Sequence, residues 1–64
     1  MNTNEIKTGK TYSWTNHNHV NGPTTYLATV VGVNPVAGRV VYRNVHGHEG
    51  VTSIADFAER YAPT

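Results

Sequence analysis

The chain has 64 residues and a formal net charge of +1, from five Lys and Arg against four Asp and Glu. A chain this short forms one domain and buries only about 60% of the surface that its unfolded form exposes. It contains no cysteine, which excludes disulfides and thiolate metal sites as sources of stability. The weak net charge excludes a strong overall field for a polyanion, so nucleic-acid binding would need a local basic patch.

The sequence predicts a cytoplasmic protein with no membrane segment. No stretch approaches the roughly 20 apolar residues of a membrane span. Residues 1–9 are polar where a signal peptide carries an apolar core. Residues 1–8 have no periodicity and are interpreted as a flexible N-terminal lead-in, which leaves residues 9–64 as a single SH3-like domain.

Two strands are predicted in the first half of the chain. Residues 10–15 alternate, which places Tyr12 and Trp14 on the inward face. Residues 16–23 are rich in Asn, Gly and Pro and indicate a long loop. Residues 24–33 are rich in β-branched and aromatic types and predict the strongest strand, with a bulge or bend at Gly32. Its alternation places Tyr26, Ala28 and Val30 on one face and Leu27, Thr29, Val31 and Val33 on the other.

The second half predicts a hairpin, a short strand and a helix. Residues 34–38 form a turn, residues 39–45 return as a strand, and residues 46–50 turn again into a short strand near Val51. Ser53 followed by Asp56 resembles a capping box. The apolar stripe that follows predicts a short helix packed against the sheet and ended before Pro63; its members are Ile54, Phe57, Ala58 and Tyr61.

These elements predict a mainly β fold: a small SH3-like curled barrel of four to five antiparallel strands with one short C-terminal helix. Closure would remove the strand edges that a small sheet otherwise exposes. The alternative is an open antiparallel sheet with the helix packed across one face.

A resemblance to a family rests on the order of several short sequences. These are Gly-Lys-Thr-Tyr at residues 9–12, Ala-Thr-Val-Val-Gly-Val at residues 28–33 and Arg-Val-Val-Tyr-Arg at residues 39–43, followed by His48 and by residues 53–61, which include Phe57. This order resembles short phage-origin proteins of unknown function with SH3-like barrels, over about the last fifty residues. The resemblance implies a phage or prophage accessory protein and supplies no catalytic residues. The His-rich first loop is longer than that pattern requires.

Two His-x-His pairs, His17 with His19 and His46 with His48, are the main metal-binding pattern. Residues two apart on an extended backbone point the same way, and four imidazoles satisfy tetrahedral zinc. Glycine and asparagine surround all four, which favours exposed turn histidines, so no metal or other cofactor is predicted. A His-based metal-binding protein stays as the second alternative function. If a histidine instead serves a partner, protonation near pH 6 would modulate binding.

A basic surface is the second pattern. Arg39 and Arg43 lie four apart on one strand, and Lys7 and Lys10 are expected to approach them. With Trp14 or Tyr26 exposed nearby, this surface would stack and hold a single-stranded nucleic acid. The competing interpretation makes the aromatic rings part of the core, which a domain poor in Leu, Ile and Phe can hardly spare.

Catalysis has the least support, because the chain lacks cysteine, a nucleophile-elbow serine and a phosphate-binding loop, and its four carboxylates are scattered. We therefore expect a non-enzymatic macromolecule-binding module, a phage or prophage accessory or inhibitory factor that acts on a host protein. A phage protein or a second copy of the chain are further candidate partners, and nucleic-acid binding is the alternative function. The predicted partner-binding residues are His17, His19, Tyr26, Arg39, Arg43, His46 and His48.

Overall fold

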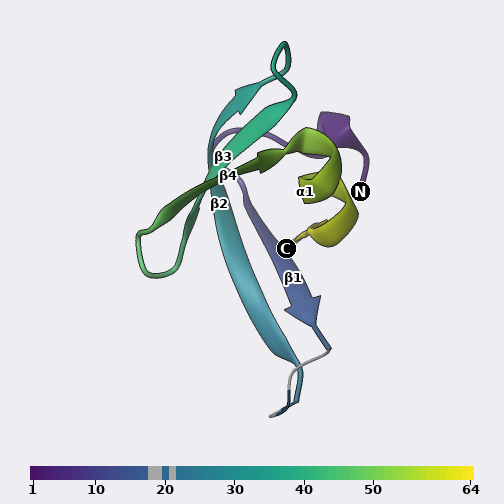
Figure 1. Cartoon of the computed structure of the whole chain (residues 1–64), viewed down its shortest axis with the longest axis vertical. Coiled ribbons are helices and arrows are strands. Elements are labelled where there is room, and N and C mark those ends of the chain that lie inside the picture. Colours follow the sequence, from purple (N-terminus) through teal and green to yellow (C-terminus); the bar gives the residue numbers. More distant parts are fainter. Residues whose placement is uncertain (18–19, 21) are drawn as a thin grey trace.

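A computed structural model describes residues 1–17, 20 and 22–64 (Figure 1). Its elements are, in chain order, the 3₁₀ helix η1 (Thr3–Glu5), strands β1 (Thr11–Asn16), β2 (Thr24–Asn34), β3 (Arg39–Asn44) and β4 (Glu49–Ser53), helix α1 (Ile54–Arg60) and strand β5 (Ala62–Pro63). All strand pairs are antiparallel, and the sheet order is β4-β3-β2-β1-β5. The predicted mainly β class, with four to five antiparallel strands and one short helix, is confirmed, although β5 lies where no strand was predicted. No described helix is long and apolar enough to cross a membrane.

The predicted closure into a barrel is wrong. β4 and β5 stand at the two ends of the sheet, and no pairing joins them among the described residues. Helix α1 begins directly after β4 and packs against β3, β4 and η1 on one side of the sheet (Figure 1). The chain therefore returns to the sheet only as the two residues of β5, which pair with Tyr12 and Ser13 of β1. The observed arrangement is the alternative, an open antiparallel sheet with a helix on one face.

A bulge in β2 decides which side chains enter the core. Val30 pairs with Tyr42 and Gly32 pairs with Val41, so Val31 is an extra residue in β2. The extra residue exchanges the two faces beyond it. Val33 therefore pairs with Val40 and packs against the core. The predicted irregularity at Gly32 is confirmed, but the expectation that Val33 shares a face with Val31 is wrong for this reason.

The core lies between the sheet and α1. Tyr12, Val30, Val40 and Phe57 are its fully buried large side chains, and Ile6, Ala28 and Ala58 are also buried. The predicted inward position of Tyr12 is confirmed, and Trp14 on the same face is half-buried. Of the predicted helix stripe, Phe57 and Ala58 are buried, and Ile54 and Tyr61 pack against them while partly exposed.

Ile6 was not predicted as a core residue. The Tyr12 hydroxyl donates a hydrogen bond to the Glu5 carbonyl oxygen at 2.6 Å and accepts one from the Lys7 N–H at 2.8 Å. These two bonds hold the chain on both sides of Ile6 against the core. A buried phenol needs such partners, and here the segment of residues 1–8 provides them. Met1 and Ile6 are the only apolar residues among residues 1–8, and two isolated residues define no period from which this docking could be predicted.

Helix α1 begins at the predicted cap. Ser53 has an extended backbone, and its hydroxyl oxygen accepts a hydrogen bond from the Asp56 N–H at 3.1 Å. Asp56 in the first turn and Arg60 in the last turn also suit the helix dipole. A helix of seven residues has few internal bonds, so the cap is a large part of its local stability.

We expect Ser53→Ala to lower the free energy of unfolding by about 0.5–2 kcal/mol, because one N–H at the start of α1 loses its acceptor. Urea denaturation followed by far-UV circular dichroism measures this change. Ser13→Ala makes the same chemical change on the sheet face that points away from α1, and we expect an effect within about 0.5 kcal/mol. Equal losses in the two variants would contradict the capping role.

Candidate partner-binding surface

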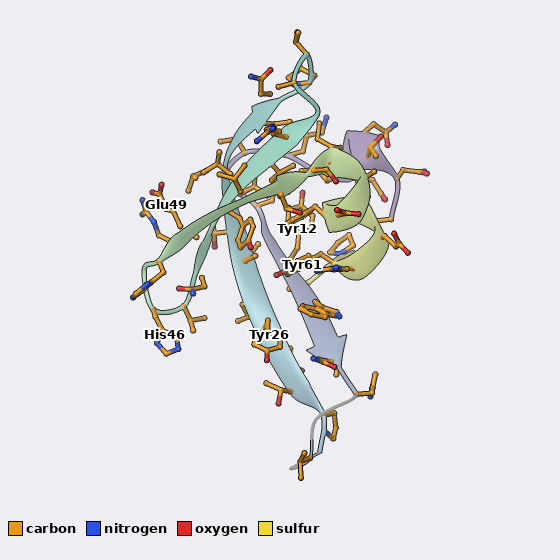
Figure 2. The ribbon with its side chains drawn as sticks, in the orientation of Figure 1. Tyr12, Tyr26, His46, Glu49 and Tyr61 are labelled. Carbon is orange, nitrogen blue, oxygen red and sulfur yellow. The ribbon has the colours of Figure 1, made fainter. Side chains whose placement is uncertain are left out.

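The six aromatic residues of the chain form one connected cluster on the face of the sheet that carries α1. Phe57 is its centre. Its ring stacks on Tyr61 with centroids 4.4 Å apart and makes a T-shaped contact with Tyr12, with centroids 5.5 Å apart. Tyr42 contacts both Phe57 and Tyr61, at 6.0 and 6.3 Å. Figure 2 shows Tyr12 and Tyr61 near α1, and Tyr26 farther along β2. The competing interpretation of the aromatic residues as core and rim packing therefore describes most of them.

The cluster has an exposed end on β1 and β2. Trp14 is tilted against Tyr61 at 6.0 Å and stacks on Tyr26 at 5.3 Å. The Arg60 guanidinium lies 5.6 Å from the centre of the Trp14 ring, a cation–π contact. Tyr26 is 40% exposed, whereas Phe57 is fully buried. The cluster thus connects the core to a ring that a partner can reach.

Tyr42 lies across a glycine on the neighbouring strand. Gly50 pairs with Tyr42 in the β3–β4 ladder. A Cβ atom on Gly50 would lie 2.7 Å from the Tyr42 hydroxyl oxygen and 2.8 Å from the ring carbon that bears it. The ring therefore occupies the space that any other side chain at residue 50 would need. This contact keeps Tyr42 against Phe57 and Tyr61.

The Tyr61 hydroxyl lies in an environment that disfavours its ionised form. Burial raises its pKa above the ordinary value, and the nearby Tyr42 and Tyr26 raise it further, while Arg60 partly offsets them. At neutral pH, Tyr61 is therefore a neutral phenol with a hydroxyl that can both donate and accept a hydrogen bond.

A groove beside the first part of β2 is lined by residues 24–27 and 44–46, and we name it the β2 groove. Its volume is about 310 Å³. It exists because β3 stops pairing with β2 at Ala28 and Asn44, whereas β1 pairs with β2 as far as Thr24. Tyr26, Leu27 and Val45 in its lining are 40%, 40% and 69% exposed. None of its described lining residues is Lys, Arg, Asp or Glu.

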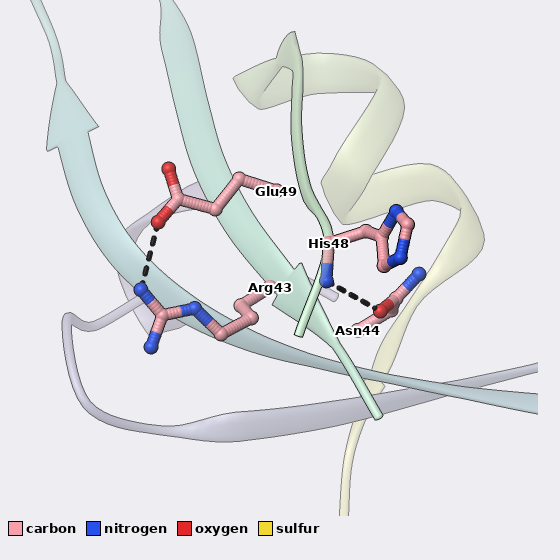
Figure 3. Close-up of polar contacts among 4 residues, drawn as sticks. All are labelled: Arg43, Asn44, His48 and Glu49. Carbon is pink, nitrogen blue, oxygen red and sulfur yellow. Dashed lines mark hydrogen bonds and ion pairs between the residues drawn. The ribbon is translucent and has the colours of Figure 1, made fainter. Parts of the chain in front are cut away.

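The turn between β3 and β4 forms one wall of the β2 groove. The Asn44 side-chain oxygen accepts hydrogen bonds from the N–H groups of His46 and His48, at 2.9 and 3.0 Å (Figure 3 shows the second). Gly47 between them has φ +82°, which favours glycine. His46 and His48 therefore do not lie on an extended backbone, which was the basis for expecting their imidazoles to point the same way.

Three of the four histidines of the predicted pattern lie among the described residues. His17, His46 and His48 are all exposed. His19 lies outside the described residues. Among the residues that the structure places, no three His, Asp or Glu side chains come close enough to hold a metal ion.

The predicted basic residues do not join the aromatic surface. Arg43 pairs with Glu49 at 2.7 Å, with both side chains about half exposed (Figure 3). Arg39 and Arg43 alternate with Val40 and Tyr42, so they lie on the sheet face opposite the aromatic cluster. Lys7 and Lys10 line a different hollow, beside β5. Arg60, which lies outside the predicted apolar stripe of α1, is the cation that contacts the Trp14 ring.

Of the predicted partner-binding residues, the structure brings Tyr26 and His46 together in the β2 groove. Sequence reasoning missed the other described lining residues, which are Thr24, Thr25, Leu27, Asn44 and Val45. Their position depends on where β3 stops pairing with β2, and alternation within one strand contains no information about that point. The only sequence signal was the difference between a ten-residue predicted strand and a seven-residue partner.

Comparison with known proteins found no matching family model, no matching curated protein and no matching solved structure.

We expect Gly50→Ala to lower the free energy of unfolding by about 1–3 kcal/mol, because the new methyl group displaces the Tyr42 ring. Thermal and urea denaturation measure the change. Gly32→Ala is the matched control, since a Cβ there meets nothing within 4 Å and its φ is not positive. A loss as large in Gly32→Ala would mean that the contact with Tyr42 is not the cause.

The raised pKa of Tyr61 predicts a pH dependence of stability above about pH 10. There the unfolded chain releases the Tyr61 proton before the folded chain does, so the stability from the neutral phenol is complete at lower pH and is lost as pH rises. We expect Tyr61→Phe to lose less stability than the wild type between about pH 9 and 11. The urea midpoints of the two proteins across this pH range measure the loss of stability, and tyrosinate absorbance follows the ionisation of the tyrosines. Parallel pH profiles would contradict the assignment.

Proposed function

We propose that the chain is a non-enzymatic module that binds another protein, and that the β2 groove is the binding surface. The observation that supports this is the groove itself, a concave site with exposed Tyr26, Leu27 and Val45 and no Lys, Arg, Asp or Glu among its described lining residues. Protein interfaces use aromatic and aliphatic anchors in a centre depleted of charge. Tyr26 is well suited as an anchor, because its stacking on Trp14 already restricts its ring.

Nucleic-acid binding is the less favoured alternative. A surface for single strands combines a basic groove with stacking rings. Here Arg39 and Arg43 lie on the face opposite the rings, and Glu49 partly neutralises Arg43. The cation that does contact Trp14 is Arg60, and its guanidinium covers that ring. The described aromatic rings and basic residues therefore do not form one surface that could stack bases and bind phosphates.

The resemblance described above supports a more specific proposal. We propose that the chain is a phage or prophage accessory factor, related to SH3-like domains, that acts on a host protein in the cytoplasm. A phage protein is a further candidate partner. A second copy of the chain is another, since a thin core gains stability from self-association.

Affinity capture from a bacterial lysate tests the proposed function. We expect the wild type to retain a discrete protein, with retention unchanged after nuclease treatment. Val45→Ser removes an apolar side chain from the β2 groove and should reduce retention severalfold. Val36→Ser makes the same change at a residue that is 98% exposed in the turn between β2 and β3, and should leave retention unchanged.

Three results would oppose the proposal. Capture of no protein would contradict protein binding. Loss of every captured protein after nuclease treatment would favour nucleic acid. Equal retention by Val45→Ser and Val36→Ser would place the binding surface elsewhere.

A further inference from the structure

We infer that the β2 groove receives an extended, uncharged peptide segment of the partner, which adds to the sheet as a short strand beside residues 24–27. This inference rests on the proposed function and specifies how the groove recognises its ligand. It depends on the backbone of β2 and on the side chains that line the groove.

The hydrogen-bonding direction of β2 is fixed at Val30. The Gly9 N–H donates to the Val30 carbonyl oxygen at 2.8 Å, and the Val30 N–H donates to the Lys10 carbonyl oxygen at 3.0 Å. Val30 therefore directs both backbone groups towards the chain leading into β1. In an antiparallel strand this direction alternates from residue to residue. The backbone N–H and C=O groups of Ala28 and Tyr26 therefore also point towards β1. Thr25 and Leu27 direct their N–H and C=O groups to the other side, into the β2 groove.

No described strand occupies that side. The pairing with β3 ends at Ala28 and Asn44. The chain then closes on itself in the turn, where the Gly47 N–H bonds to the Asn44 carbonyl and the Asn44 N–H bonds to the His48 carbonyl. The groups of Thr25 and Leu27 are spaced as in a sheet ladder, and an extended backbone is the ligand that matches this spacing.

The two outer strands of the sheet carry features that prevent pairing with another chain, whereas residues 24–27 of β2 do not. β4 is short and carries Glu49 paired with Arg43. β5 has two residues, of which one is Pro63. Charge, short length and proline are the devices that keep strand edges from pairing with other chains. Residues 24–27 are Thr, Thr, Tyr and Leu, with none of these devices except the preceding Pro23.

The lining defines the chemistry of the peptide. Leu27 and Val45 supply apolar contacts, and Tyr26 supplies an aromatic one on the face of Trp14. A charged side chain would find no Lys, Arg, Asp or Glu among the described lining residues. Because Asn44 already pairs with Ala28, about four peptide residues fit, one opposite each of residues 24–27. The inferred ligand is therefore a neutral segment of about four β-forming residues, with apolar side chains.

Binding of peptides selected from a random hexapeptide library tests this inference. The binding of each selected peptide is followed by the fluorescence of Trp14, the only tryptophan of the chain, which stacks on Tyr26. Amide hydrogen exchange then locates the peptide. We expect neutral, apolar sequences, and slower exchange at Thr25 and Leu27 when they bind.

Leu27→Pro is the decisive variant, since it removes the N–H that points into the β2 groove at an edge position where proline is tolerated. We expect about tenfold weaker peptide binding, whereas Val36→Ser should bind as the wild type does. If Leu27→Pro does not fold, peptides with N-methylated alternate amides are compared with unmodified peptides on the wild-type chain. The unmodified peptides should bind about tenfold more tightly.

Several outcomes would overturn the inference. They are the selection of no peptide, peptide binding without protection of the Thr25 and Leu27 amides, peptide binding by Leu27→Pro as tight as by the wild type, and binding of N-methylated peptides as tight as that of unmodified peptides. If raising the protein concentration alone slows hydrogen exchange at these amides, and sedimentation shows a dimer, the strand that pairs with residues 24–27 comes from a second copy of the chain. If the lysate protein is still captured by Leu27→Pro, protein binding stands and strand addition fails. If no protein is captured at all, the proposed function fails first.

Discussion

The Tyr12 side chain is the contact on which the fold depends. Its ring packs against Phe57 in a T-shaped arrangement, and its hydroxyl bonds to both Glu5 and Lys7. One side chain of β1 therefore joins the sheet, the helix and the segment before β1. Tyr12 and Phe57 are the largest fully buried side chains, and the rest of the core consists of smaller aliphatic residues. The remaining rings extend this packing outward until it reaches the solvent at Tyr26.

The candidate site follows from a mismatch in strand length. β2 has eleven residues and β3 has six, so β2 cannot be paired on both sides along its length. The bulge at Val31 belongs to the same arrangement, because it allows the far end of β2 to present Val33 to the core. The end of β2 that carries Val33 thus packs against the core. The other end carries Tyr26, Leu27 and two threonines beside an open edge, where the proposed partner binds.

The sequence was sufficient for the local structure and insufficient for closure. Alternation located the strands, Ser53 located the start of the helix, and the stripe through Phe57 indicated the face of the helix that packs. Closure depends on whether residues 62–63 and residues 49–53 meet, and no local pattern reports such a distant pairing. The docking of Ile6 was missed for a related reason, since it depends on the hydroxyl of Tyr12 rather than on a period.

The site was predictable only in part. Tyr26 and His46 were expected to contact a partner, and they line one groove. Arg39 and Arg43 were expected to share a surface with aromatic rings, but period-two alternation on β3 places them opposite Tyr42 and its neighbours. The role of Arg60 at Trp14 could not be read from the helix stripe, because the stripe does not include residues at its border.

The strand order also has a consequence for how the chain assembles. β1 to β4 are joined by successive hairpins, so each can zip onto its predecessor through contacts close in sequence. The last neighbour of β1 is β5, where Tyr12 pairs with Pro63 across nearly the whole chain. Bringing such distant segments together costs loop entropy before any contact compensates for it. Early intermediates would therefore hold Tyr12 with only one of its two neighbouring strands, and its ring would be covered only when Phe57 arrives.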